Sequence, residues 1–119
     1  MGNLCLHAQD LNIYLQKVGT TEQHLSSFEI CQGDKVQVIS NTYDFHIDSL
    51  GFEYKKNGVW ESANRFSSTN PPISQGAPFS MTVSSKESSE YRLKFYSNNL
   101  QPKYSNTVSV IIKSCTITK

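Results

Sequence analysis

Short polar residues at 88–90 are followed at once by large apolar residues that alternate with charged ones. Tyr91, Leu93 and Phe95 fall on one face of an extended strand, whereas Arg92 and Lys94 fall on the other. Such alternation is typical of a strand with one buried face. We therefore interpret this stretch as a central strand of a sheet that packs against a second layer.

The same alternation recurs along the chain, with no convincing helical period between the alternating segments. Residues 41–50 and 63–77 are predicted to be connections, the second because Pro71-Pro72 is incompatible with a central strand. The predicted fold class is all-β, a sandwich of about seven antiparallel strands in two sheets. The strands are expected near residues 11–16, 35–40, 51–56, 59–62, 79–83, 91–95 and 108–112.

Two alternatives exist for Trp60, because Asn57-Gly58 is a strong hairpin signal. A two-residue turn would pair Lys55 with Trp60 and point the indole outward. A three-residue loop would pair Tyr54 with Trp60 and point both into the core, which is where a lone tryptophan usually lies. In the outward case the sheet carries a mixed aromatic and charged surface, suited to a sugar ring or a protein partner. This candidate binding face comprises Glu53, Lys55, Trp60, Arg92, Lys94 and Tyr96; its alternative is an ordinary solvated sheet face.

The chain has 119 residues, the size of one domain, and its formal charge is +1. We therefore expect neither nucleic acid nor an anionic membrane as a partner, and no apolar run is long enough to span a bilayer. Residues 1–9 are interpreted as a signal-peptide remnant or a disordered N-terminal arm. Residues 10–115 are predicted to form the sandwich, and residues 116–119 a C-terminal tail or the start of a linker.

Three stretches, in this order along the chain, resemble the immunoglobulin-like repeats of Bacteroidetes surface and secreted proteins. They are residues 30–36, 52–58 and 105–110. The resemblance implies an extracellular, often tandem, non-catalytic module with no particular ligand. Such repeats usually have tryptophan where this chain has Tyr54, whose hydroxyl would need a partner. Tyr91 fits the tyrosine corner of these sandwiches, but Ser40 and Leu93 stand where their core cysteines would be.

The sandwich topology implied by this resemblance also suggests a disulfide. In it the second strand starts, and the last strand ends, at the same end of the molecule, so Cys31 and Cys115 are expected to pair. The alternative is two free thiols in a reducing compartment. Cys5 would then be odd, either removed with a signal peptide or free.

Other candidate chemistry is weak. Asp44, His46 and Asp48 alternate and would share one side of an extended chain, but this triplet satisfies the ligand needs of neither calcium nor zinc. We therefore favour a solvated strand face and expect no metal and no cofactor. The chain has no nucleophile elbow, no Gly-rich phosphate loop and no recognisable Cys–His pair, so we expect no enzyme.

These features predict a structural spacer or an adhesion and interaction domain of a secreted or cell-surface bacterial protein. The expected partners are neighbouring domains or another protein. The alternative is a carbohydrate-binding module that uses exposed aromatic residues around Trp60 to bind a glycan.

Overall fold

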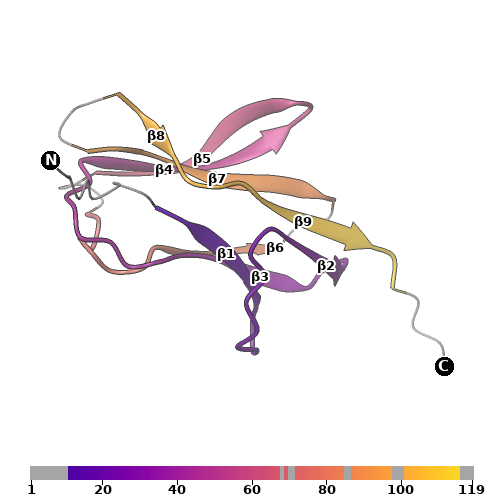
Figure 1. Ribbon diagram of the computed structural model, residues 1–119. Helices are drawn as coiled ribbons and strands as arrows, with labels where there is room; N and C mark the ends of the chain where they lie inside the picture. Colours follow the sequence, from indigo (N-terminus) through magenta and orange to yellow (C-terminus); the bar gives the residue numbers. More distant parts are fainter. Residues whose placement is uncertain (1–10, 68, 70–71, 85–86, 98–100, 116–119) are drawn as a thin grey trace, which may run out of the picture.

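A computed structural model describes residues 11–67, 69, 72–84, 87–97 and 101–115, and this part of the chain has no helix. Nine strands are present (Figure 1). The predicted N-terminal arm at residues 1–9 and the tail at 116–119 lie outside the described residues. The strands are β1 (Ile13–Lys17), β2 (Ser27–Cys31), β3 (Lys35–Ser40), β4 (Ser49–Lys56), β5 (Val59–Ser67), β6 (Ser80–Ser84), β7 (Ser89–Tyr96), β8 (Lys103–Tyr104) and β9 (Val108–Lys113).

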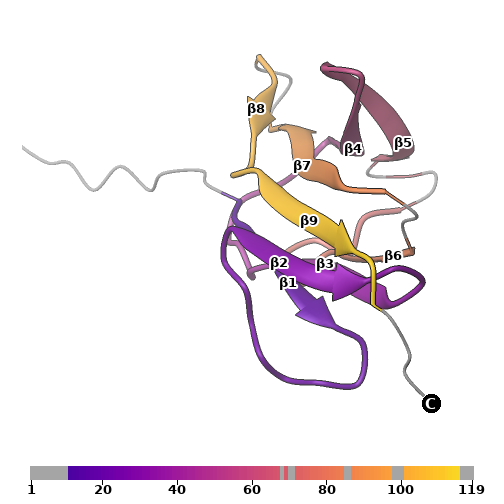
Figure 2. The ribbon, with the colours of Figure 1, turned by 90° about the vertical axis from the view of Figure 1, so that its right-hand side faces the viewer.

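The strands form two sheets that pack face to face (Figures 1 and 2). The small sheet has the order β1-β3-β6, and the large sheet has the order β2-β9-β7-β4-β5, with β8 added beside β7. All pairings are antiparallel except that of β2 with β9, which is parallel. The prediction of an all-β, two-sheet sandwich is therefore confirmed.

The core lies between the two sheets and follows the predicted alternation. Strand β7 illustrates this, because Tyr91, Leu93 and Phe95 are buried whereas the residues between them are only partly covered. Apolar residues from β1, β3, β4 and β9 meet them, as expected for two inner faces that interdigitate. The other buried apolar residues are Leu11, Ile13, Leu15, Ile30, Val36, Val38, Ile47, Leu50, Phe52, Val108 and Val110.

The strand count differs from the predicted seven at two places. Strand β2, which pairs with β9 at the edge of the large sheet, was not among the predicted strands. Strand β8 has two residues, too few to show any alternation.

Strand β5 is also longer than predicted, because residues 63–67 continue it where a loop was expected. The pairing shifts between Phe52 and Glu53, which face Asn64 and Ser62, so Ala63 is an extra residue in β5. Such a β-bulge interrupts the alternation from which the strand would be recognised.

The chain enters and leaves the sandwich at opposite ends of β9. At the start of β9, the Asn106 side chain accepts a hydrogen bond from Ile13 N (2.7 Å) and donates one to Ile13 O (2.9 Å). Cys115 follows the other end of β9 and forms a disulfide with Cys31, with the two Cα atoms 5.4 Å apart. The predicted pairing is thus present, and it joins the ends of two parallel neighbours, β2 and β9.

Candidate functional site

The outer face of the large sheet turns away from the small sheet (Figure 1). Strands β4, β5, β7 and β8 all contribute to it, and their register places alternate residues of each strand on this side. All six residues of the candidate binding face lie on this side. Tyr104 lies there too; it was not predicted because β8 has only two residues. We call this surface the outer face: Glu53, Lys55, Trp60, Arg92, Lys94, Tyr96 and Tyr104.

The hairpin between β4 and β5 decides where Trp60 points. Asn57 and Gly58 have φ values of 53° and 79°, and Lys55 pairs with Trp60. Positive φ at both central residues is the signature of a two-residue type I′ turn. Of the two alternatives the outward one is therefore present, and the expectation of a core indole beside Tyr54 is wrong. Trp60 is nevertheless half-buried, since neighbouring side chains on the outer face cover part of it.

Arg92 is the centre of the outer face. Its guanidinium carbon lies 4.1 Å from the ring centroid of Trp60 and 4.0 Å from that of Tyr104. Arg92 Nε also donates a 2.8 Å hydrogen bond to Glu53, whose side chain is only 11% exposed. Contacts of a cation with two rings and a carboxylate fix the arginine rotamer. The three strands β5, β7 and β8 are thereby linked on the outer side.

Lysines extend this arrangement in both directions. Lys55 Nζ lies 5.7 Å from the Trp60 ring centroid and 4.0 Å from Glu90 Oε2. Lys94 Nζ lies 5.8 Å from the ring centroid of Tyr96. The outer face thus alternates cations with aromatic rings, and two of its cations are paired with carboxylates.

A hollow of about 430 Å³ opens on the outer face next to this arrangement. Gly51 forms its floor, because no side chain rises from β4 at that position. Its lining includes two cations, one carboxylate, serine hydroxyls and three apolar or aromatic side chains. The lining residues are Ser49, Leu50, Gly51, Glu53, Ser62, Arg65, Phe66, Ser67, Lys94 and Tyr96.

Tyr54 lies on the opposite side of β4 from the outer face, at the rim of the core. Its hydroxyl donates a 3.1 Å hydrogen bond to Glu61, its cross-strand neighbour. That hydrogen bond, and then the negative charge of Glu61, raise the pKa of Tyr54 above its ordinary value of 10.0. The hydroxyl that distinguishes this residue from tryptophan therefore has a partner.

Tyr91 is 6% exposed and stacks on Phe52, with ring centroids 5.4 Å apart. The turn before β7 includes residues 85 and 86, which lie outside the described residues. The tyrosine corner therefore stays a prediction.

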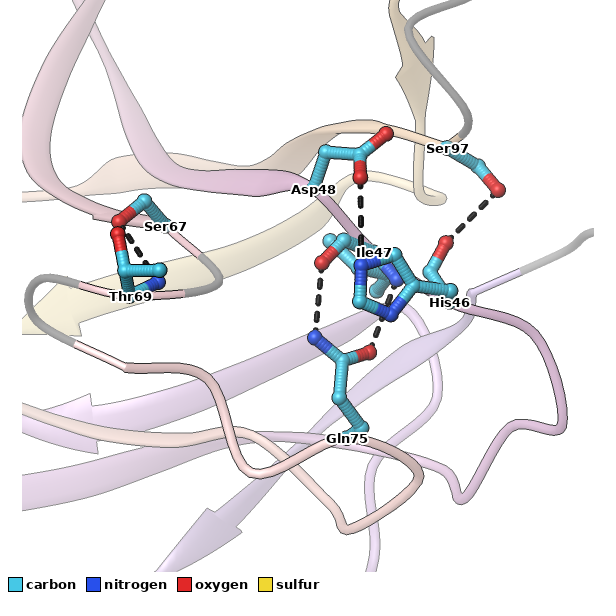
Figure 3. A network of polar contacts seen from close by, with 7 residues as sticks. All are labelled: His46, Ile47, Asp48, Ser67, Thr69, Gln75 and Ser97. Atoms are coloured by element: carbon cyan, nitrogen blue, oxygen red, sulfur yellow. Dashed lines mark hydrogen bonds and ion pairs between the residues drawn. The ribbon is translucent and has the colours of Figure 1, made fainter.

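The triplet of Asp44, His46 and Asp48 lies in the predicted connection between β3 and β4, so it is not the solvated strand face that its alternation suggested. His46 Nε2 is 3.2 Å from Asp48 Oδ1, and neighbouring segments hold this connection in place (Figure 3). The Gln75 amide donates to Ile47 O and accepts from Ile47 N, as Figure 3 shows. Within the described ranges, no three His, Cys, Asp or Glu side chains gather closely enough to hold a metal ion.

No helix long and apolar enough to cross a membrane occurs in the part of the chain that is described. Cys5 lies outside that part, so its state, removed with a signal peptide or free, stays a prediction. The chain matches no protein-family model and no curated protein. The resemblance to immunoglobulin-like repeats therefore stays a prediction from the sequence.

Proposed function

We propose that this chain is a non-catalytic, immunoglobulin-like module of a secreted or cell-surface protein and serves as a spacer. The strand order supports this role. The set β1-β3-β6 corresponds to strands A, B and E of an immunoglobulin-like sandwich, and β9-β7-β4-β5 corresponds to G, F, C and C′. The Cys31–Cys115 disulfide supports an oxidising compartment outside the cytosol.

The observation that carries the spacer role is the position of the disulfide relative to the chain ends. A pull on the C-terminal side of Cys115 passes directly through the sulfur atoms to Cys31. From there it runs back through β2 and β1 to the start of the sandwich. Strands β3 to β9 lie inside the closed loop, so tension between the chain ends cannot unravel them. Such a module would keep most of its fold under load.

Single-molecule stretching tests this load path. The Cys5→Ser chain is fused at both ends to marker domains and pulled under oxidising conditions. Of the described residues before Cys115, only 11–31 lie outside the closed loop, so we expect them to release at most about 75 Å of chain at roughly 3.3–3.6 Å per residue. Reduction should release a further ~300 Å, from the segment between the two cysteines, which are 84 positions apart. A release of about 300 Å from the oxidised domain would overturn the proposal.

The composition of the outer face favours a second role for it, adhesion to a protein partner. Trp, Tyr and Arg are the residue types enriched at the energetic centres of protein interfaces, and Trp60, Tyr104 and Arg92 lie together here. Sugar stacking on Trp60 has less support, because the Arg92 guanidinium occupies one face of the indole.

A further inference from the structure

We propose that the hollow on the outer face binds the carboxylate and ring of an acidic sugar, such as a uronic acid. This site is distinct from the spacer role and does not depend on it. It is also distinct from the Trp60 ring, which Arg92 and Lys55 contact from β7 and β4.

The positive charges that line the hollow favour an anionic ligand. Arg65 and Lys94 both line it, and neither makes an ion pair with a carboxylate of the described residues. Glu53 also lines it, but its charge is already engaged by Arg92 at 2.8 Å. Arg65 Nε donates to Ser62 Oγ at 3.3 Å, which orients the guanidinium and leaves its two terminal nitrogens for a ligand. The two cations lie on neighbours of one central strand, since Arg65 and Lys94 both pair with Gly51.

The size of the hollow suits a small molecule such as a single sugar. Its volume of about 430 Å³ lies in the range of small-molecule sites. The space exists because Gly51 has no side chain, and the φ of Gly51 is not one that requires glycine. A Cβ placed there would meet its nearest atoms only at 3.8 Å, so the floor has room for a larger residue.

The remaining lining residues favour a sugar over an acidic protein side chain. Ser49 and Ser62 contribute hydroxyl groups, which both donate and accept hydrogen bonds as the hydroxyls of a sugar do. The Tyr96 ring supplies an apolar surface beside them, of the kind that packs against the C–H face of a sugar ring. The carboxylate of a peptide side chain would contact the cations but not these hydroxyls.

The test is an NMR titration of the isotope-labelled, oxidised chain with galacturonate, and with galactose as the matched neutral sugar. We expect galacturonate to shift the amide signals of β4, β5 and β7 around Gly51 in a saturable way. Galactose should bind at least about tenfold more weakly, because it lacks the charge-assisted hydrogen bonds to Arg65 and Lys94.

Three test variants and one control variant separate the effect of charge from the effect of shape. Arg65→Gln and Lys94→Gln should each weaken galacturonate binding about tenfold, while Lys113→Gln, with the same charge change at an exposed site on β9, should leave it unchanged. Gly51→Leu keeps both cations but fills the floor, so it should abolish binding. The circular dichroism spectrum and the unfolding transition of each variant test whether it is folded. We expect Gly51→Leu to fold, because leucine suits a strand better than glycine does.

Four outcomes would overturn the inference. The first is equal binding of galactose, and the second is an equal loss in Lys113→Gln. The third is undiminished binding by folded Gly51→Leu. The fourth is the absence of shifts with galacturonate, including the case in which a glutamate-containing peptide shifts the same signals and so identifies a protein partner instead.

Discussion

The side chain of Asn106 makes the pair of hydrogen bonds to Ile13 that the backbone of a neighbouring strand would otherwise make. Its amide oxygen accepts from Ile13 N and its amide nitrogen donates to Ile13 O, at 2.7 and 2.9 Å. Ile13 is only 2% exposed, so these backbone groups have little access to water. The contact joins β1 of the small sheet to the segment that leads into β9 of the large sheet. A residue in a connection thus helps to hold the two layers together.

We expect Asn106→Ala to lower the free energy of unfolding by about 1–3 kcal/mol, because two buried backbone groups would lose their partners. Asn41→Ala is the matched control. Its side chain accepts one hydrogen bond, from Asn12 N at 3.0 Å, at an exposed site where water can replace it. Urea unfolding of both variants gives the comparison. Equal losses of stability in the two variants would show that the hydrogen bonds of Asn106 to Ile13 stabilise the fold no more than an exposed hydrogen bond does.

At the scale of elements, the β4–β5 hairpin decides which residues of β5 join the outer face. A slip of one residue in β5 would move Trp60 to the other side of the sheet. The register is fixed by the type I′ turn at Asn57-Gly58 and by the bulge at Ala63.

Gly58→Ala should therefore lower the free energy of unfolding by roughly 1 kcal/mol or more, since alanine is strained at a φ of 79°. Gly51→Ala, in the same hairpin but without a positive φ, should be neutral or slightly stabilising. Thermal or urea unfolding distinguishes them. A hairpin that tolerates both changes equally would contradict the turn assignment.

The sequence predicted those elements whose residues alternate without interruption. Strands β3, β7 and β9 lie where their buried valines, leucine and aromatic residues indicated, because one face of each meets the core. Strand β2 was not predicted, because only Phe28 and Ile30 mark its alternation within five residues. The end of β5 was hidden by the bulge at Ala63, and β8 by its length.

The candidate site was predictable only in part, for a related reason. Alternation placed five residues on one face, but only the turn geometry decided that Trp60 joins them. Tyr104 and Arg65 reach the outer face through β8 and the second half of β5, the two places where strand prediction failed. The hollow itself arises from a missing side chain at Gly51, and alternation alone gives no signal for that.

On the scale of the whole molecule, the disulfide contributes to the stability of the sandwich and determines how it responds to tension. The Cys31–Cys115 bond closes a loop of 84 residues and ties β2 to β9 at the edge of the large sheet. By the chain-entropy model, closing a loop of this length stabilises the fold by about 4–5 kcal/mol, less any strain in the folded state. The compartment, the load path and the spacer role proposed above all depend on this pairing.

Peptide mapping by mass spectrometry, on unreduced protein with free thiols blocked before digestion, tests this pairing directly. We predict one linked pair of peptides, containing Cys31 and Cys115, and no link to Cys5. A link from Cys5 to either partner, or blocked thiols at all three positions, would contradict the account and remove the load path on which the spacer role rests.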